Sequence, residues 1–181
     1  MQPHLFVLPR ERPKVVIKAD LLPAVSVLSM VGLLGIPLGW LWSRLAPPQR
    51  VRVFPNNELI PLQMESWHRF DDLAVFVLLG LAGGVLVGAV LWLLRERRGP
   101  VVLFAAVGGS VLGGWLAVQM GTAFANGRYE VTAAPKVGDV IEQAPRLESM
   151  WVLLAQPVTL ALVYALLAAW NGRDDLGRRL G

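Results

Sequence analysis

Four long stretches of apolar residues, separated by polar segments, dominate the chain. Each stretch has about the 20 residues that an α-helix needs to cross the hydrocarbon core of a bilayer. Lipid offers no hydrogen-bonding partner to an open backbone, so each stretch is predicted to be helical. The pattern therefore predicts an all-α membrane protein with four transmembrane helices, at residues 21–45, 73–94, 101–124 and 151–170.

The polar segments define the rest of the organisation. They are a basic leader, a first outer loop, a short basic turn, a second outer loop and a tail, at residues 1–20, 46–72, 95–100, 125–150 and 171–181. Charged and apolar residues alternate in residues 50–54, which favours a β-hairpin in the first loop. In the second loop, residues 128–132 and 137–141 are expected to pair. An isolated hairpin is marginally stable in water, so we expect the two loops to support each other or to lean on a partner.

Basic residues predict the orientation of the helices. If both termini are cytoplasmic, ten basic residues lie inside and seven outside, and the short turn at 95–100 carries three arginines. Positive charges in short loops favour the cytoplasmic side, so we expect both termini inside, in a bacterial plasma membrane. The first helix is expected to be an uncleaved anchor, because a 20-residue leader precedes an apolar run longer than that of a signal peptide.

Composition supports this picture and excludes several function classes. Hydrophobic residues make up 55% of the chain and charged residues 17%, whereas soluble domains contain about 25% charged residues. The absence of cysteine excludes disulfides and thiolate metal sites. The net charge of +4 is explained by basic residues that flank the apolar stretches, so we expect no nucleic-acid partner.

Glycines four residues apart form stripes on three of the predicted helices. Such stripes allow a second helix to approach closely. This is consistent with packing within the bundle and also with docking of a helix from another protein. The glycines of this candidate interface are Gly80, Gly84, Gly88, Gly109, Gly113, Gly121, Gly35 and Gly39.

Tryptophans lie near the predicted ends of the helices. Amphipathic aromatic rings favour the headgroup region of a bilayer, so these residues are predicted to be membrane-interface anchors. They are Trp40, Trp42, Trp67, Trp92, Trp151 and Trp170. Trp115 lies inside the third helix and is expected to pack between helices.

Candidate chemistry is sparse. Glu65, His68, Asp71 and Asp72 have helical spacing and are acceptable metal-ligand types. The second loop offers no further histidine, which favours the simpler interpretation of an interfacial helix start. No catalytic motif occurs, and no Asp, Glu, Lys or His lies in the middle of a predicted helix. We therefore expect no enzyme activity, no cofactor and no metal; Gln156-Pro157 is the only polar kink candidate.

The two halves of the chain resemble each other. Each contains a helix, an outer loop, a second helix and a basic segment, and residues 39–41 read Gly-Trp-Leu, as do residues 114–116. A parallel internal repeat would explain this likeness, and so would the chance similarity of two helical hairpins.

The chain as a whole resembles a family of small four-span membrane proteins of unknown function from actinobacteria. The residues that carry the resemblance are the glycine-rich run at 79–84, the run at 91–100, Val101-Val102-Leu103 and the Gly113-Gly114 pair. The resemblance implies a four-helix membrane fold, and it implies no activity, substrate or site residue.

These observations lead to an expected function. We expect a non-catalytic accessory or assembly subunit of a larger membrane complex, which contacts the lipid bilayer and other membrane subunits through its helices and outer loops. The alternative is a small dimerising transporter or channel-like protein for a neutral or apolar solute. A third hypothesis is an envelope-related enzyme with its chemistry in the outer loops.

Overall fold

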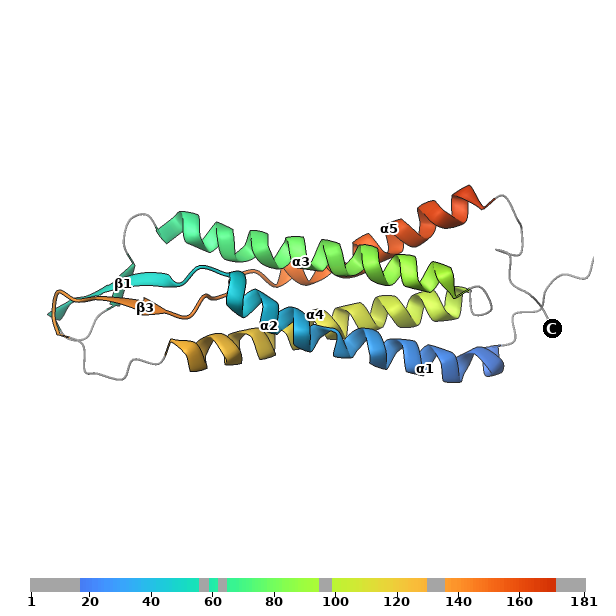
Figure 1. Cartoon of the computed structure of the whole chain (residues 1–181), viewed down its shortest axis with the longest axis horizontal. Coiled ribbons are helices and arrows are strands. Elements are labelled where there is room, and N and C mark those ends of the chain that lie inside the picture. The colour runs from blue at the N-terminus through green and yellow to red at the C-terminus, as the bar shows by residue number, and fades with distance from the viewer. Residues whose placement is uncertain (1–16, 56–58, 62–64, 95–98, 130–135, 172–181) are drawn as a thin grey trace, which may run out of the picture.

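The computed structural model describes residues 17–55, 59–61, 65–94, 99–129 and 136–171, and the side chains of 17–20, 59, 61 and 65–69 are not described. Figure 1 shows an elongated bundle of helices with a small sheet at one end. The helices are α1 (Ile17–Leu33), α2 (Gly35–Leu45), α3 (Glu65–Leu93), α4 (Pro100–Arg128), the 3-10 helix η3 (Met150–Leu154) and α5 (Ala155–Trp170). The strands are β1 (Gln49–Val53), β2 (Leu59–Pro61) and β3 (Val140–Gln143).

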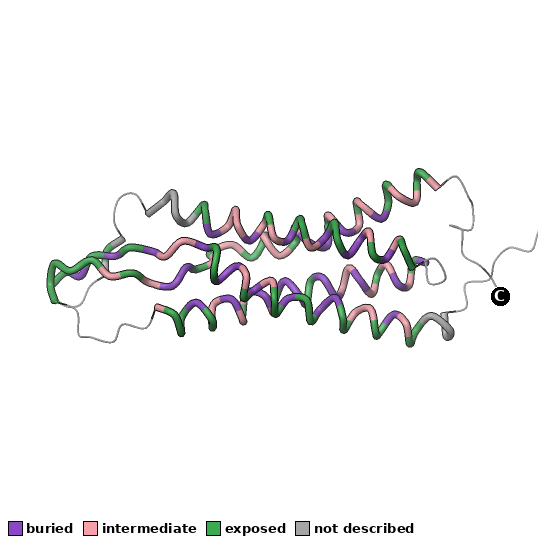
Figure 2. Tube along the Cα trace, viewed as in Figure 1, coloured by how far each residue is buried: buried purple, intermediate pink, exposed green. Residues whose placement is uncertain are grey.

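Four helical segments are long and apolar enough to cross a membrane, which confirms the predicted number. They are Leu21–Leu45, Phe70–Leu93, Pro100–Arg128 and Met150–Trp170. Large apolar side chains remain exposed along the outside of the bundle, and Leu22, Leu93 and Phe104 are each more than 70% exposed. Figure 2 shows that exposed residues recur along all the helices. A surface of this kind fits lipid, so the chain is a multi-pass membrane protein.

Prolines and a glycine set the breaks between helices. The first span is interrupted at Leu34, where α1 ends and α2 begins. Pro37 has no N–H, and its ring crowds the carbonyl of the residue four positions earlier, which is Leu33. At the other end of the bundle, Gly99 is the N-cap of α4 and Pro100 its first residue, a position that suits proline because the first N–H of a helix has no intrahelical acceptor.

The spans pack as two parallel pairs. The first pair is α1 and α2 with α4. Leu28 contacts Gly109 and Gly39 contacts Gly121, so residue numbers increase in the same direction along both partners. The second pair is α3 with α5, and contacts advance from Gly80 against Gln156 to Gly88 against Val163. The first spans of the two chain halves therefore pack together, and so do the second spans. A parallel repeat about an axis along the bundle would give this arrangement.

A three-stranded antiparallel sheet joins the two loops. Its order is β2-β1-β3, with Arg52 opposite Ile60 of β2 and also opposite Val140 of β3. Side chains of β1 alternate between buried and exposed, and Val51 and Val53 are almost completely buried.

The second loop differs from its expected hairpin. Arg128 is still helical, because α4 continues beyond the apolar run into polar residues, and β3 pairs with β1 of the other loop. Residues 136–139 instead form a turn: the Lys136 amide donates to the Asp139 carboxylate, and Gly138 adopts a φ of 98°. Residues 130–135 of the predicted pairing lie outside the described residues.

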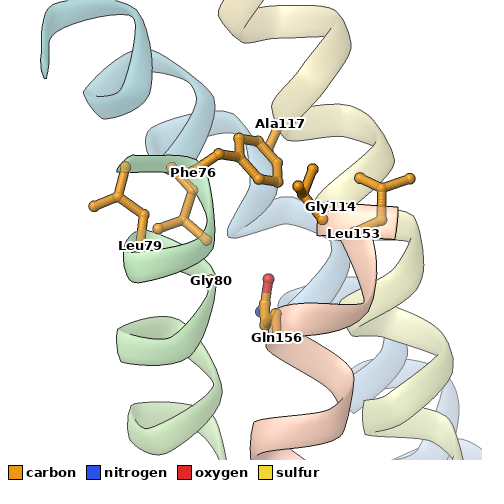
Figure 3. A pocket seen from close by; sticks show the side chains of 9 residues that line it. Phe76, Leu79, Gly80, Gly114, Ala117, Leu153 and Gln156 are labelled. Carbon is orange, nitrogen blue, oxygen red and sulfur yellow. The ribbon is translucent and has the colours of Figure 1, made fainter. Parts of the chain in front are cut away.

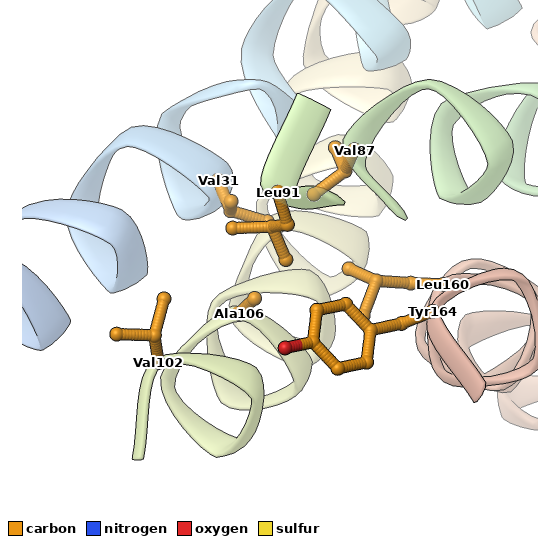
Figure 4. Close-up of a cluster of buried hydrophobic side chains, with 7 residues drawn as sticks. All are labelled: Val31, Val87, Leu91, Val102, Ala106, Leu160 and Tyr164. Atoms are coloured by element: carbon orange, nitrogen blue, oxygen red, sulfur yellow. The ribbon is translucent and has the colours of Figure 1, made fainter. Parts of the chain in front are cut away.

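Two apolar clusters fill the bundle. The first contains Val31, Val87, Leu91, Val102, Ala106, Leu160 and Tyr164 (Figure 4). The second lies nearer the sheet and contains Trp42, Ala46, Phe76 and Ala117. Small and medium side chains dominate the first cluster, whereas the second is built around the aromatic rings of Trp42 and Phe76.

Candidate functional site

The closest helix approach joins α2 to α4. A Cβ atom on Gly35 would overlap the carbonyl oxygen of Gly113 and would lie 2.7 Å from its carbonyl carbon. A Cβ on Gly39 would overlap the Ala117 carbonyl oxygen, and one on Gly109 would lie 2.7 Å from the Leu28 carbonyl oxygen. Backbone therefore packs on backbone along this line, which we call the first seam.

A second seam joins α3 to α5. A Cβ on Gly84 would lie 2.6 Å from the Gln156 carbonyl oxygen and 2.8 Å from the Thr159 Cβ. A Cβ on Gly88 would lie 3.0 Å from the Val163 Cβ. Here glycines on α3 form a groove, and α5 fills the groove with Cβ atoms and with its backbone, as the 3.0 Å between a Cβ on Gly84 and the Leu160 amide nitrogen shows.

The predicted glycine interface thus lies inside the chain. All eight glycines face another helix of the same protein at close range: Gly35, Gly39, Gly80, Gly84, Gly88, Gly109, Gly113 and Gly121. The stripes are occupied by intramolecular packing, so they provide no argument for a partner helix.

The tryptophans separate into exposed and packed residues. Trp40, Trp151 and Trp170 are 48%, 80% and 93% exposed, which suits side chains that face lipid or headgroups. Trp92 is half-buried and packs edge-to-face on Tyr164, with ring centroids 5.7 Å apart. The side chain of Trp67 lies outside the described residues.

Two expectations about tryptophan are wrong. Trp42, expected at the membrane interface, is completely buried, with an edge-to-face contact to Phe76 and an indole N–H that donates to the Asp72 carbonyl oxygen at 3.0 Å. Trp115, expected between helices, is 48% exposed. Position along the span determines depth in the bilayer, whereas the side of the helix determines burial. Trp42 lies seven residues after Gly35 and so shares its face, whereas Trp115 is two residues from Gly113 and points away.

The four candidate ligands near the start of α3 do not form a described cluster. Asp72 is completely buried beside Trp42, and Asp71 is exposed. The side chains of Glu65 and His68 lie outside the described residues. Among the residues that the structure describes, no three His, Cys, Asp or Glu side chains come together in a way that could hold a metal ion.

Sequence reasoning missed a small cavity in the middle of the bundle. Residues from all four spans line it, and Gln156 points into the space bounded by Phe76, Gly80 and Gly114 (Figure 3). Gln156 is only 3% exposed. Its adjacent proline had marked this position as a polar kink, but the cavity depends on which helices meet there, and no local pattern specifies that.

The end of the molecule beyond the helices exposes charged side chains next to apolar ones such as Val137 and Val140. Arg50 of β1 and Glu142 of β3 lie opposite each other, and Arg50 Nε is 3.5 Å from a Glu142 carboxylate oxygen. Both side chains are largely exposed, so this pair contributes little to stability. Within the described residues, β2 and β3 each pair with a strand on one side only.

Sequence comparison assigns the chain to a family. A family model described as a protein of unknown function, DUF2567, matches residues 28–178. The chain belongs to this family. The match begins within α1 and includes both seams, the sheet and α5.

Similar members of the family come from mycobacteria. The chain is 32% identical over 162 residues to the uncharacterized protein Rv1591 of Mycobacterium tuberculosis, covering 79% of this chain and 84% of the relative. It is 34% identical over 174 residues to the uncharacterized protein ML1222 of Mycobacterium leprae, covering 85% and 86%. These relatives confirm the resemblance to an actinobacterial family. No solved structure is significantly similar to the chain.

Proposed function

We propose that this protein is a non-catalytic accessory or assembly subunit of a larger complex in the bacterial plasma membrane. One observation carries the proposal: a rigidly packed bundle presents a small sheet, whose strands β2 and β3 each have an unpaired side within the described residues. An open strand edge offers backbone hydrogen bonds to an incoming strand, which is a common mode of protein recognition.

The proposed orientation places the sheet outside the cytoplasm. The sequence carries three arginines at 95–98, between α3 and α4, whereas the sheet is built from the two connections that precede α3 and follow α4. Short basic connections favour the cytoplasmic side. The sheet is then the part of the protein that is best placed to meet a partner outside the membrane.

The interior of the bundle supports a structural role more than transport. A transporter for a neutral solute requires a path through the helices, whereas the described interior is filled by two apolar clusters, and the small cavity lies within the second of them. Ser110 of α4 and Gln156 of α5 are buried polar side chains of this interior. No observation specifically favours the transporter alternative.

Affinity purification of the full-length protein in mild detergent, followed by mass spectrometry, tests the proposal. We expect one larger membrane complex to co-purify with the protein. The double variant Val137→Lys/Val140→Lys adds charge at two exposed residues of the sheet end and should reduce recovery of the complex at least about tenfold. Arg146→Glu, at an exposed residue outside the strand, serves as the matched control. Recovery of a monomer or homodimer alone would contradict the proposal.

A further inference from the structure

The helices of the first pair end in arginines at the same end of the bundle. Arg44 lies in the last turn of α2 and Arg128 in the last turn of α4, and both helices end toward the sheet (Figure 1). Both side chains are exposed. The spans that contain them end at Leu45 and at Arg128 itself. The first pair therefore presents two cations where its spans leave the apolar part of the bundle.

Each of these arginines lies over an aromatic ring. The Arg44 Cζ atom is 5.4 Å from the centroid of the Trp40 ring, and the Arg128 Cζ atom is 5.7 Å from that of the Tyr129 ring. Both distances are within the roughly 6 Å at which the face of a ring attracts a cation. Stacking occupies one flat face of a guanidinium and leaves its N–H edge available. That edge is the part of arginine that binds two oxygens of a phosphate.

Neither arginine is paired with a carboxylate among the residues that the structure describes. The ion pair described at this end joins Arg50 to Glu142 within the sheet. The described side chains at the corresponding boundary of α3 are acidic, because Asp71 and Asp72 follow directly on the start of its span at Phe70. An anion that approaches this end of the bundle is therefore attracted to the side formed by α2 and α4.

Both arginines lie at the depth of lipid headgroups. The span in α4 has 29 residues, which at about 1.5 Å per residue gives about 44 Å, the thickness of a bilayer with both headgroup layers. Gly39 packs on Gly121. Arg44 and Arg128 follow these glycines by five and seven residues, so their depths differ by about 3 Å. Both guanidinium groups thus reach the layer that contains phospholipid phosphates.

We propose that this end of the first pair binds the phosphate groups of anionic phospholipids, one at Arg44 and one at Arg128. Each guanidinium donates two parallel N–H hydrogen bonds to a phosphate, and the rings of Trp40 and Tyr129 fix its plane. Anionic lipids are preferred because a zwitterionic headgroup carries its own cation, which competes with arginine for the phosphate. The binding is independent of the orientation of the bundle and of the proposed accessory role.

Native mass spectrometry of the full-length protein, released from nanodiscs of mixed phosphatidylglycerol and phosphatidylcholine, measures this preference. The wild type should retain phosphatidylglycerol. Each arginine at a bilayer surface contributes about a fivefold factor to the affinity for anionic lipid, so Arg44→Gln/Arg128→Gln should lower the preference about 25-fold. Arg52→Gln/Arg146→Gln removes the same charge from exposed residues outside the spans and should keep the preference. Equal losses in the two double variants, or no preference in the wild type, would overturn the proposal.

The contribution of the ring is measured in the same way. Trp40→Leu keeps the net charge and removes the ring beneath Arg44, so the preference for phosphatidylglycerol should fall about threefold. Trp151→Leu is the matched control, because Trp151 is also exposed and no arginine is described over its ring. Equal effects of the two substitutions would show that Trp40 does not position Arg44, and would overturn this part of the site.

A free anion is distinguished from a lipid in detergent solution. Phosphatidylglycerol added to the delipidated full-length protein should raise the Tm of the wild type more than that of Arg44→Gln/Arg128→Gln, and inorganic phosphate should raise neither. An equal rise with inorganic phosphate would overturn the assignment to lipid.

Discussion

The two seams bring helices together by different means. In the first, the backbone of α2 rests on the backbone of α4, and glycines on both sides are required, as Gly35 against Gly113 illustrates. In the second, glycines of α3 meet the Cβ atoms of Thr159 and Val163 as well as the backbone of Gln156 and Leu160, and α5 carries no glycine in this region. A glycine stripe in the sequence thus indicates close approach but does not reveal whether a backbone or a side chain fills the groove.

This difference has energetic consequences. In both seams an added methyl group would meet backbone or Cβ atoms, which move only if the helix moves, but the overlap is deeper at Gly35 and Gly39 than at Gly80, Gly84 and Gly88. The first seam should therefore tolerate substitution less well than the second. Four predictions test this ranking, and each is measured as the free energy of unfolding in one detergent, followed by circular dichroism.

Gly35→Ala is expected to have the largest effect. The added Cβ would overlap the Gly113 backbone, so the variant should lose about 3 kcal/mol of stability. Gly108→Ala is the control because its Cβ would meet only the Leu28 Cδ1 at 3.9 Å. The control should lose nothing, since alanine has the higher helix propensity. Equal losses in the two variants would show that the first seam is not a backbone contact.

Gly84→Ala should be less harmful, with a loss of about 2 kcal/mol. Its Cβ would lie 2.6 Å from the Gln156 carbonyl oxygen, 2.8 Å from the Thr159 Cβ and 3.0 Å from the Leu160 amide nitrogen, which is a shallower overlap than at Gly35. Gly83→Ala is the neighbouring control, with its nearest contact at 3.5 Å. A loss greater than that of Gly35→Ala would reverse the ranking of the seams.

Trp42→Phe examines how the first seam is joined to the second pair. The variant removes the indole donor to the Asp72 carbonyl oxygen of α3 while it keeps an aromatic ring, so we expect a loss of about 1 kcal/mol. Trp115→Phe, at a half-exposed position, should leave the stability unchanged. If both variants behave alike, the buried hydrogen bond makes no net contribution.

Gly80→Ala should have the smallest effect, below about 1 kcal/mol. Its Cβ would lie 3.2 Å from the Ala155 Cβ and 3.4 Å from the Gln156 amide nitrogen, a mild crowding that the gain in helix propensity partly offsets. A loss as large as that of Gly84→Ala would mean that α5 lies equally close to α3 at both glycines, and the depth of overlap would not explain the ranking.

The sequence was sufficient to predict the four spans, because an uninterrupted apolar run of this length has few other stable structures. It also predicted the start of α4 at Gly99-Pro100, where both residues have a local reason to end one helix and begin another. The alternation in Arg50–Phe54 indicated the strand that became β1.

Contacts between distant segments could not be predicted in the same way. No local pattern states that β3 pairs with β1, or that residues of four spans enclose a cavity around Gln156. The tryptophans show an intermediate case. The burial of Trp42 follows from helical periodicity once Gly35 and Gly39 are known to face α4, so the information was present but required knowledge of the packing partner.

The parallel pairing has a consequence for biosynthesis. Spans are made in chain order, and the first two leave the ribosome before the third and fourth exist. Neither seam can form within the first hairpin, because the packing partners of Gly35 and Gly84 are Gly113 and Thr159, which belong to the later half of the chain. The early half must therefore reside in the membrane with both glycine faces covered only by lipid or by the insertion machinery, and its structure is completed when the later half arrives.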